Sequence, residues 1–413
     1  IRERVEEYHR VVGSMTARWD GQETPLSQLM SRLHDADRTV RERAWRLVAG
    51  RRLADEGRLD RLFDELLELR AGDPARSLRE RGRFDYGLEE CRRLDESIER
   101  VFVPLRRRAN EERRRRLGVD QLRPWDLQVD PEGRPPSVPF DPDRLIESCR
   151  RILGQVDPGL ARTFDALAAS DLLDLDRRED KAPGAFLEVY PLRRLPFLYL
   201  APTGRADDLR TLLRESGRAF RALACRDEPI FAYRKVPIEF DELVGSAIEL
   251  LGTPHLGAAL GEADRRRSVE DQHRRLLEIL VQGAAGDAFQ DWLYSHPGHA
   301  AAERARAWIG LQERYDPGID WSGLEEFRGL GWQRVAPFFE TPFHYVEYAV
   351  ARIGALQVRL RQTSDPSGAV RDLRRALALG GSRPLPELYA AAGAPFAFDE
   401  RALRPLAAHL RDG

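Results

Sequence analysis

Lysine is almost absent from this sequence of 413 residues, in which Lys181 and Lys235 are the only two. The 67 basic side chains are therefore nearly all arginines, and 69 acidic side chains balance them. This balance gives no reason to expect nucleic acid or an anionic membrane surface as a partner. Because arginine is so common, each arginine has to be judged by its position in the chain.

Cysteines and long apolar runs are also scarce. Cys91, Cys149 and Cys225 are odd in number and far apart, which argues against a disulfide framework and favours reduced thiols. No stretch approaches the ~20 apolar residues of a membrane span, and the first residues have no apolar run of the signal-peptide type. We therefore expect a soluble, cytoplasmic, globular protein.

Helical periodicity covers most of the sequence. Apolar residues recur at spacings of three and four with charged residues between them. Beyond two such patterns in the first 70 residues, the ranges that show this spacing are 86–116, 206–225, 263–281, 343–361 and 367–379. Asp365-Pro366 supplies an N-cap and a first-turn proline, and Gly380-Gly381 marks the end of that helix. The fold class is predicted to be mainly α.

Two segments interrupt the helical pattern. Residues 123–143 are rich in proline and glycine, so they are predicted to connect an N-terminal helical lobe, 1–122, to a second lobe, 144–413. Residues 184–201 form two apolar or alternating runs around a Pro-Leu-Arg-Arg turn, which predicts a β-hairpin or two adjacent strands.

The segment that follows this hairpin contains Arg214-Glu215-Ser216-Gly217-Arg218. If Arg214 and Arg218 were histidines, it would read H-E-x-x-H, in which two imidazoles on one helix face bind zinc and the glutamate acts as general base. A guanidinium has five donors and no free lone pair, so it cannot coordinate a cation.

A plain structural interpretation also fits this segment. Its arginines form one stripe at helical spacing, and its large apolar residues form the opposite stripe: Arg210, Arg214, Arg218 and Arg221 against Leu209, Leu212, Leu213, Phe220 and Leu223. Taken alone, the periodicity describes an amphipathic surface helix whose arginines point into water.

The surrounding segments favour a different interpretation. The stretches KAPGAF (181–186), DDLRTLLRESGRAF (207–220), VPIEFDELVGSAIELL (236–251) and WQRVAPFFETPFHYVEYAVARIGALQV (332–358) follow in order. In this order they resemble the oligoendopeptidase F family of zinc metallopeptidases, which is related to thimet oligopeptidase. The resemblance runs from near residue 4 to near residue 411. It implies a two-lobed helical, zincin-like fold around a deep channel, with one small sheet near 184–201.

The resemblance also implies roles for individual residues. Glu215 matches the general base and Glu242 matches the third metal ligand, whereas Arg214 and Arg218 replace both histidine ligands. Residues Gly184, Ala185 and Phe186 match the strand that pairs with the bound peptide backbone.

The C-terminal motif departs from the family pattern as well. Pro337 stands where the family has a histidine, and His344-Tyr345 stands where it has paired tyrosines that stabilise the oxyanion. Several parts of the catalytic machinery are therefore altered together, which predicts loss of zinc-dependent peptide hydrolysis.

Three functions remain open from the sequence. The first is a degenerate oligoendopeptidase that binds a peptide or peptide-like ligand and holds no metal or cofactor, zinc included. The second is a repurposed enzyme in which Arg214 and Arg218 bind an anionic group of a small substrate and Glu215 or Tyr345 moves a proton. The third and weakest is a metallopeptidase in which carboxylates and His344 hold a hard cation. The oligomeric state is left open.

Without zinc, Glu215 and Glu242 would be buried anions in need of partners. If the resemblance places the residues correctly, at least one of Arg214 and Arg218 should hydrogen-bond to one of these carboxylates.

Overall fold

The protein is mostly α-helical with small sheets, as predicted. The computed structural model describes residues 1–70, 85–133, 141–178, 181–182 and 184–412. Part of the predicted connection, 134–140, lies outside these residues. No helix of the described chain is long and apolar enough to cross a membrane.

Helix α16 (Pro366–Leu379) begins and ends at the capping residues that the sequence predicts. The Asp365 carboxylate accepts a hydrogen bond from the Gly368 backbone N–H at 2.9 Å, which caps the first turn. Gly380 follows the last turn with a φ of 53°, a left-handed conformation that favours glycine.

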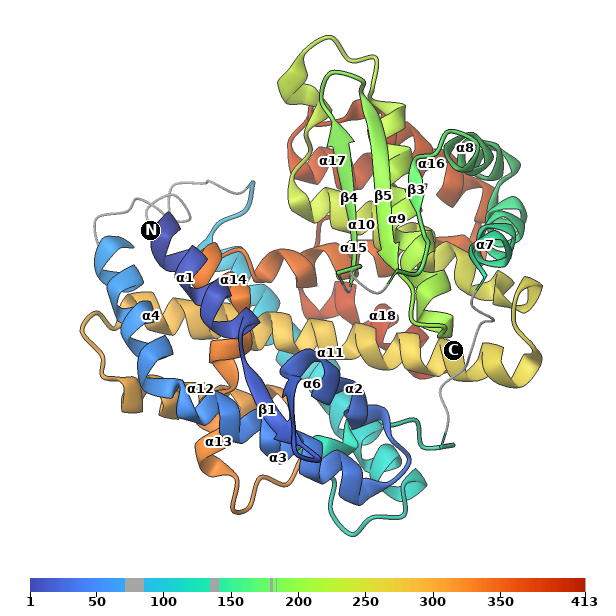
Figure 1. Cartoon of the computed structure of the whole chain (residues 1–413). Helices are drawn as coiled ribbons and strands as arrows, with labels where there is room; N and C mark the ends of the chain where they lie inside the picture. Colours follow the sequence, from blue (N-terminus) through green and yellow to red (C-terminus); the bar gives the residue numbers. More distant parts are fainter. Residues whose placement is uncertain (71–84, 134–140, 179–180, 183, 413) are drawn as a thin grey trace. The chain divides into compact units, whose positions relative to one another are not determined.

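The described chain packs as two units (Figure 1). The first comprises Ile1–Pro135 and Val281–Val346, and the second comprises Pro136–Leu280 and Glu347–Gly413. The first unit contains α1 (Arg2–Gly13), β1 (Thr16–Trp19), β2 (Gln22–Pro25), α2 (Leu26–Ser31), η1 (Arg32–His34), α3 (Arg38–Ala54), α4 (Glu56–Arg70), α6 (Leu88–Arg116), η2 (Pro124–Asp126), α12 (Ala301–Tyr315), α13 (Glu325–Gly329), η5 (Gly331–Arg334) and α14 (Ala336–Glu340).

The second unit holds the small sheet and the altered motif. It contains α7 (Pro142–Val156), α8 (Pro158–Ala168), β3 (Leu173–Asp174), β4 (Gly184–Tyr190), β5 (Leu195–Ala201), α9 (Ala206–Ala224), η3 (Phe231–Arg234), α10 (Ile238–Gly252), η4 (Thr253–Ala258), nearly all of α15 (Val346–Ser364), α16, α17 (Leu385–Ala391) and α18 (Glu400–Asp412). Helix α11 (Glu262–Ser295) contributes its first part to the second unit and the rest to the first.

This division differs from the two consecutive lobes that the sequence analysis expects. The change of unit after Pro135 falls within the predicted connection, but residues 281–346 pack with the N-terminal segment. The chain therefore passes between the units more than once, and one of these passages lies inside the continuous helix α11. Helical periodicity in the sequence does not reveal where a chain changes unit, because one helix can continue from one hydrophobic core into another.

The predicted strand pair at 184–201 is confirmed. Strands β4 and β5 are antiparallel, with Gly184 opposite Ala201 and Tyr190 opposite Leu195. The strand order is β3-β5-β4, so β4 is an edge strand. Helix α9 packs against β5 and β4, and α10 packs against α9 (Figure 1).

Two glycines bring α9 and α10 unusually close together. A Cβ atom on Gly217 of α9 would lie 2.9 Å from the Val244 carbonyl oxygen. A Cβ atom on Gly245 of α10 would lie 2.9 Å from the Arg214 carbonyl oxygen and 3.1 Å from Cγ of Arg218. Side chains on the facing edges of these helices therefore reach each other over short distances.

Replacement of Gly245 by alanine should push the two helices apart. Because the new methyl group meets backbone on the facing helix, we expect Gly245→Ala to lower the free energy of unfolding by about 1–3 kcal/mol. Gly154→Ala in α7 is the matched control, because its Cβ would meet only Cβ of Ala161 at 3.8 Å. The control should raise the free energy of unfolding by about 0.5–1 kcal/mol. Urea unfolding followed by circular dichroism measures both changes, and a neutral Gly245→Ala would contradict this account of the helix contact.

Candidate functional site

Helix α9 places Arg214, Glu215 and Arg218 toward α10. Its first turn is fixed by Asp208, whose carboxylate accepts hydrogen bonds from the backbone N–H groups of Thr203, Gly204 and Arg205. The large apolar residues of the helix are buried: Leu209, Leu212, Leu213 and Phe220. The predicted apolar stripe is therefore correct, but the arginine stripe does not simply face water.

Arg218 is the centre of an ion-pair cluster on α9, α10 and α15. Its members are Arg214, Glu215, Arg218, Arg221, Asp241, Glu242, Glu249 and Arg352. It donates to Glu215 over 3.0 Å between Nη1 and Oε2, and to Asp241 of α10 over 2.7 Å between Nε and Oδ2. The side chain of Glu215 is only 4% exposed. Asp241 also accepts a hydrogen bond of 2.8 Å from Nε of Arg221. Glu215 and Asp241, two carboxylates with little exposure to water, are therefore both bonded to Arg218.

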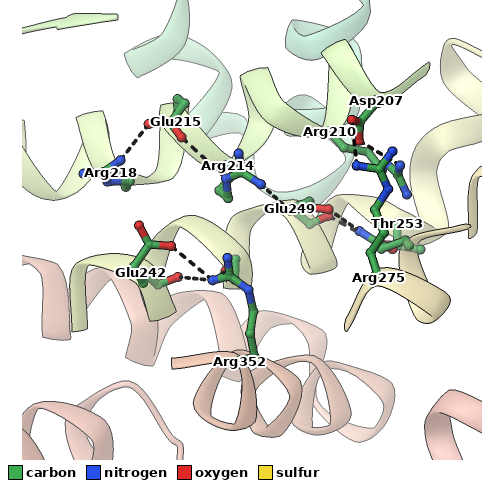
Figure 2. Close-up of polar contacts among 12 residues, drawn as sticks. Asp207, Arg210, Arg214, Glu215, Arg218, Glu242, Glu249, Thr253, Arg275 and Arg352 are labelled. Atoms are coloured by element: carbon green, nitrogen blue, oxygen red, sulfur yellow. Dashed lines mark hydrogen bonds and ion pairs between the residues drawn. The ribbon is translucent and has the colours of Figure 1, made fainter. Parts of the chain in front are cut away.

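This contact confirms that one of the two motif arginines pairs with Glu215 or Glu242. It also contradicts the surface-helix interpretation, which leaves both arginines without a carboxylate partner. Arg218 is half-buried and bonded on two sides. Figure 2 shows its contact with Glu215 along one face of α9.

Glu242 has a partner that the sequence analysis did not identify. Arg352, from α15, lies with Nη1 3.2 Å from Oε2 of Glu242 (Figure 2). It also contacts the Ser246 hydroxyl. Arg352 is itself buried. The carboxylate that matches the third metal ligand is therefore neutralised by a cation from a different helix, and neither motif arginine is bonded to it.

Arg214 is held much more loosely than its neighbours. Its Nε lies 3.4 Å from Oε1 of the adjacent Glu215, and its Nη1 lies 4.0 Å from Oε2 of Glu249. Its side chain is 32% exposed. Glu249 is in turn bonded through Oε1 to Nε2 of Gln272 at 2.8 Å. The two motif arginines therefore differ: Arg218 is a structural cross-link, whereas Arg214 keeps most of its donors uncommitted within the described chain.

The electrostatics of the cluster favour charged arginines. Burial by itself lowers the pKa of Arg218, but Asp241 and Glu215 outweigh it and raise that pKa above its usual value. The same holds for Arg214, where burial is outweighed by Glu249, Glu215 and Glu242. The cluster contains four cations and four anions: Arg214, Arg218, Arg221 and Arg352 with Glu215, Asp241, Glu242 and Glu249. Its formal charges therefore cancel.

The residues at this site do not fit a zinc ion. Two ligand positions hold guanidinium groups, which have no lone pair to donate. The remaining carboxylates, Glu215 and Glu242, are already bonded to Arg218 and Arg352. The described residues also contain no group of three or more His, Cys, Asp or Glu side chains arranged to hold a metal.

The other predicted site residues fall into two groups. Gly184, Ala185 and Phe186 form the start of edge strand β4 in the same unit, and Phe186 stacks on Tyr199 with 4.7 Å between ring centroids. His344 and Tyr345 belong to the first unit. The Tyr345 ring packs there against Phe338 at 5.3 Å and directly over Gly286.

Asp241, Glu249 and Arg352 belong to the cluster but were not predicted from the sequence as site residues. Asp241 and Glu249 were open to detection, because they lie one residue before Glu242 and two helical turns after it on α10. Arg352 gave no local signal, since its contact with Glu242 spans 110 residues of sequence.

Comparisons with known proteins place this architecture among solved peptidase structures. No protein-family model and no curated protein matches the sequence. A structure of PZ peptidase A with an inhibitor matches with a TM-score of 0.89 and 26% identity, over 100% of this chain and 75% of that one. A structure described as a candidate oligoendopeptidase F matches with a TM-score of 0.89 and 27% identity, over 99% of this chain and 74% of that one.

A more distant match adds support for the fold alone. The structure of oligoendopeptidase F from Enterococcus faecium has a TM-score of 0.67 and 13% identity, over 99% of this chain and 70% of that one. Helical architecture is thus retained at low identity across these structures.

The two motif arginines should differ in their effect on stability. We expect Arg218→Ala to lower the free energy of unfolding by about 2–4 kcal/mol, because it leaves the buried Glu215 with only its long contact to Arg214. Arg214→Ala should cost about 1 kcal/mol or less, because its contacts are long and partly exposed. Chemical denaturation of both variants beside the parent tests this order. Equal costs for the two substitutions would contradict the division of roles.

Proposed function

The chain is a structural member of the oligoendopeptidase F family, and on this premise we propose that it binds peptides but has lost zinc-dependent peptide hydrolysis. The observation that carries the proposal is the pairing of the motif residues. Arg218 is bonded to Glu215, and Glu242 is bonded to Arg352. Both acidic groups that match catalytic positions are therefore engaged with cations of the protein itself.

This pairing bears on the chemistry directly. A general base must offer a carboxylate oxygen to the proton that it takes, and Oε2 of Glu215 already accepts a hydrogen bond from Arg218. Because Arg214 and Arg218 offer no lone pairs to zinc, we expect no metal-bound water beside Glu215 for it to activate. Glu215 thus belongs to the ion pairs that join α9 to α10 through Arg218, and Glu242 joins α10 to α15.

Peptide binding is supported by the edge strand β4. Among the described strands it pairs only with β5, so its outer edge can accept a further strand. Phe186 and Tyr190 on this strand are 48% and 43% exposed. Aromatic side chains beside an open strand edge suit an extended peptide, because the backbone supplies hydrogen bonds and the rings supply apolar contact area.

A second candidate is a repurposed enzyme that binds an anionic group of its substrate at the motif arginines. The loose pairing of Arg214 favours this candidate. The engagement of Glu215 with Arg218 disfavours it, because this leaves the proposed proton carrier committed to an ion pair.

The first test is metal content. The purified protein should contain no stoichiometric zinc, and a chelator should leave its melting temperature unchanged, because Arg214 and Arg218 offer no lone pairs. Elemental analysis and thermal unfolding with and without chelator measure this. Short fluorogenic peptides should remain uncleaved in the same preparation. Near one equivalent of bound zinc together with chelator-sensitive cleavage would reject the proposal in favour of an unusual metallopeptidase.

The second test restores the ligands step by step. Arg214→His with Arg218→His should create only weak zinc binding, because Glu242 remains paired with Arg352. Adding Arg352→Gln removes the competing cation and should strengthen zinc binding roughly tenfold, about 1.4 kcal/mol. Arg359→Gln on the same helix is the control, because Arg359 donates to Gln362 rather than to the cluster. Titration calorimetry with zinc measures the affinities. No gain from Arg352→Gln would show that Arg352 does not hold Glu242 away from a metal.

A further inference from the structure

We infer that Arg214 is the anchor for a carboxylate group of the bound ligand, an inference that rests on the peptide-binding function proposed above. The guanidinium groups around the motif differ in how closely they contact carboxylates. Arg218, Arg221 and Arg352 each make a contact of 3.2 Å or shorter to a carboxylate. Arg214 has none shorter than 3.4 Å in the described part of the chain.

The local geometry leaves Arg214 able to accept a partner. A guanidinium carries five N–H donors, and its planar edge matches a carboxylate through two parallel hydrogen bonds. Of these donors, only Nε of Arg214 makes a hydrogen bond, and that bond is long. The side chain is also more exposed than that of Arg218, 32% against 23%. Arg214 therefore combines a partly exposed side chain and donors without a short hydrogen bond in the described chain with a position inside the cluster.

The carboxylates nearest to Arg214 are mostly committed to other groups. Glu215 accepts from Arg218 at 3.0 Å, and Glu249 accepts from Gln272 at 2.8 Å. Glu249 is the remaining competitor, because its second oxygen lies 4.0 Å from Arg214 without a hydrogen bond (Figure 2). A ligand carboxylate that binds Arg214 in a bidentate manner replaces this long contact with two short ones.

The ligand chemistry is thus a carboxylate at the end of a peptide or on an acidic side chain. Arginine suits such a group better than a point charge does, because the paired donors fix its orientation as well as its charge. Arg214 occupies a position that matches a metal ligand in the related peptidases. A peptide bound there would be recognised by its negative charge and would not be polarised by a metal.

The test uses the full chain and three pools of short randomised peptides. The first pool has free C-terminal carboxylates and no acidic side chains, the second has C-terminal amides and no acidic side chains, and the third has C-terminal amides and an internal glutamate. We expect retention of the first or the third pool to exceed that of the second about tenfold, measured by affinity selection and mass spectrometry. The pool that is retained identifies the source of the carboxylate.

Matched variants assign the preference to one side chain. Arg214→Gln should abolish the preference for carboxylates, whereas Arg205→Gln, at the start of the same helix, should leave it unchanged. Glu249→Gln removes the competing carboxylate and should strengthen retention severalfold. Unchanged or weaker retention by Glu249→Gln would count against the inference, as would a carboxylate preference that persists in Arg214→Gln. Because thermal unfolding is recorded for each variant, a loss of folding is recognised.

The outcomes separate this inference from the proposed function. If all three pools bind equally, the protein binds peptides but Arg214 does not anchor a carboxylate. If no pool is retained, peptide binding itself is rejected, and the inference falls with it.

Discussion

A carboxylate removed from water needs a positive charge beside it, and Glu215 imposes this requirement on the whole cluster. Its side chain is almost fully enclosed, so an uncompensated charge there would cost several kcal/mol. Arg218 meets the requirement from one helical turn away and extends the same guanidinium to Asp241 on the facing helix. The ion pairs thus connect two helices as well as neutralising one residue.

The glycine contact between α9 and α10 determines how these charges can pair. Since Gly217 and Gly245 leave no room for a Cβ atom, the aliphatic stems of the arginines lie against the facing backbone. Their guanidinium groups then reach toward Asp241 and Glu249 of α10. A wider helix separation would place water between these groups and weaken each pair. Backbone packing and electrostatics therefore depend on each other here.

Local sequence patterns predicted the elements better than the contacts between them. The helices and the hairpin follow from residue spacing along the chain, whereas the pairing of a motif arginine with Glu215 or Glu242 was predicted from the resemblance to the oligoendopeptidase F family. The partner of Glu242 could not be predicted in this way, because Arg352 approaches from α15 and periodicity does not say which helices meet. The placement of residues 281–346 with the N-terminal segment has the same cause, since it depends on packing between distant parts of the chain. The different pairing of Arg214 and Arg218 also required coordinates, because the two residues look equivalent in the sequence.

The sharing of Arg218 between Glu215 and Asp241 has an evolutionary consequence. A single change of Arg218 to histidine removes a permanent cation while the buried acids remain, and the resulting chain has neither a metal nor the ion pair. The free-energy costs of these substitutions are coupled, because Glu242 would remain paired with Arg352 until Arg352 also changed. A chain that carries these arginines therefore cannot reach a set of zinc ligands at these positions through individually neutral substitutions. Any path to such a set passes through less stable proteins.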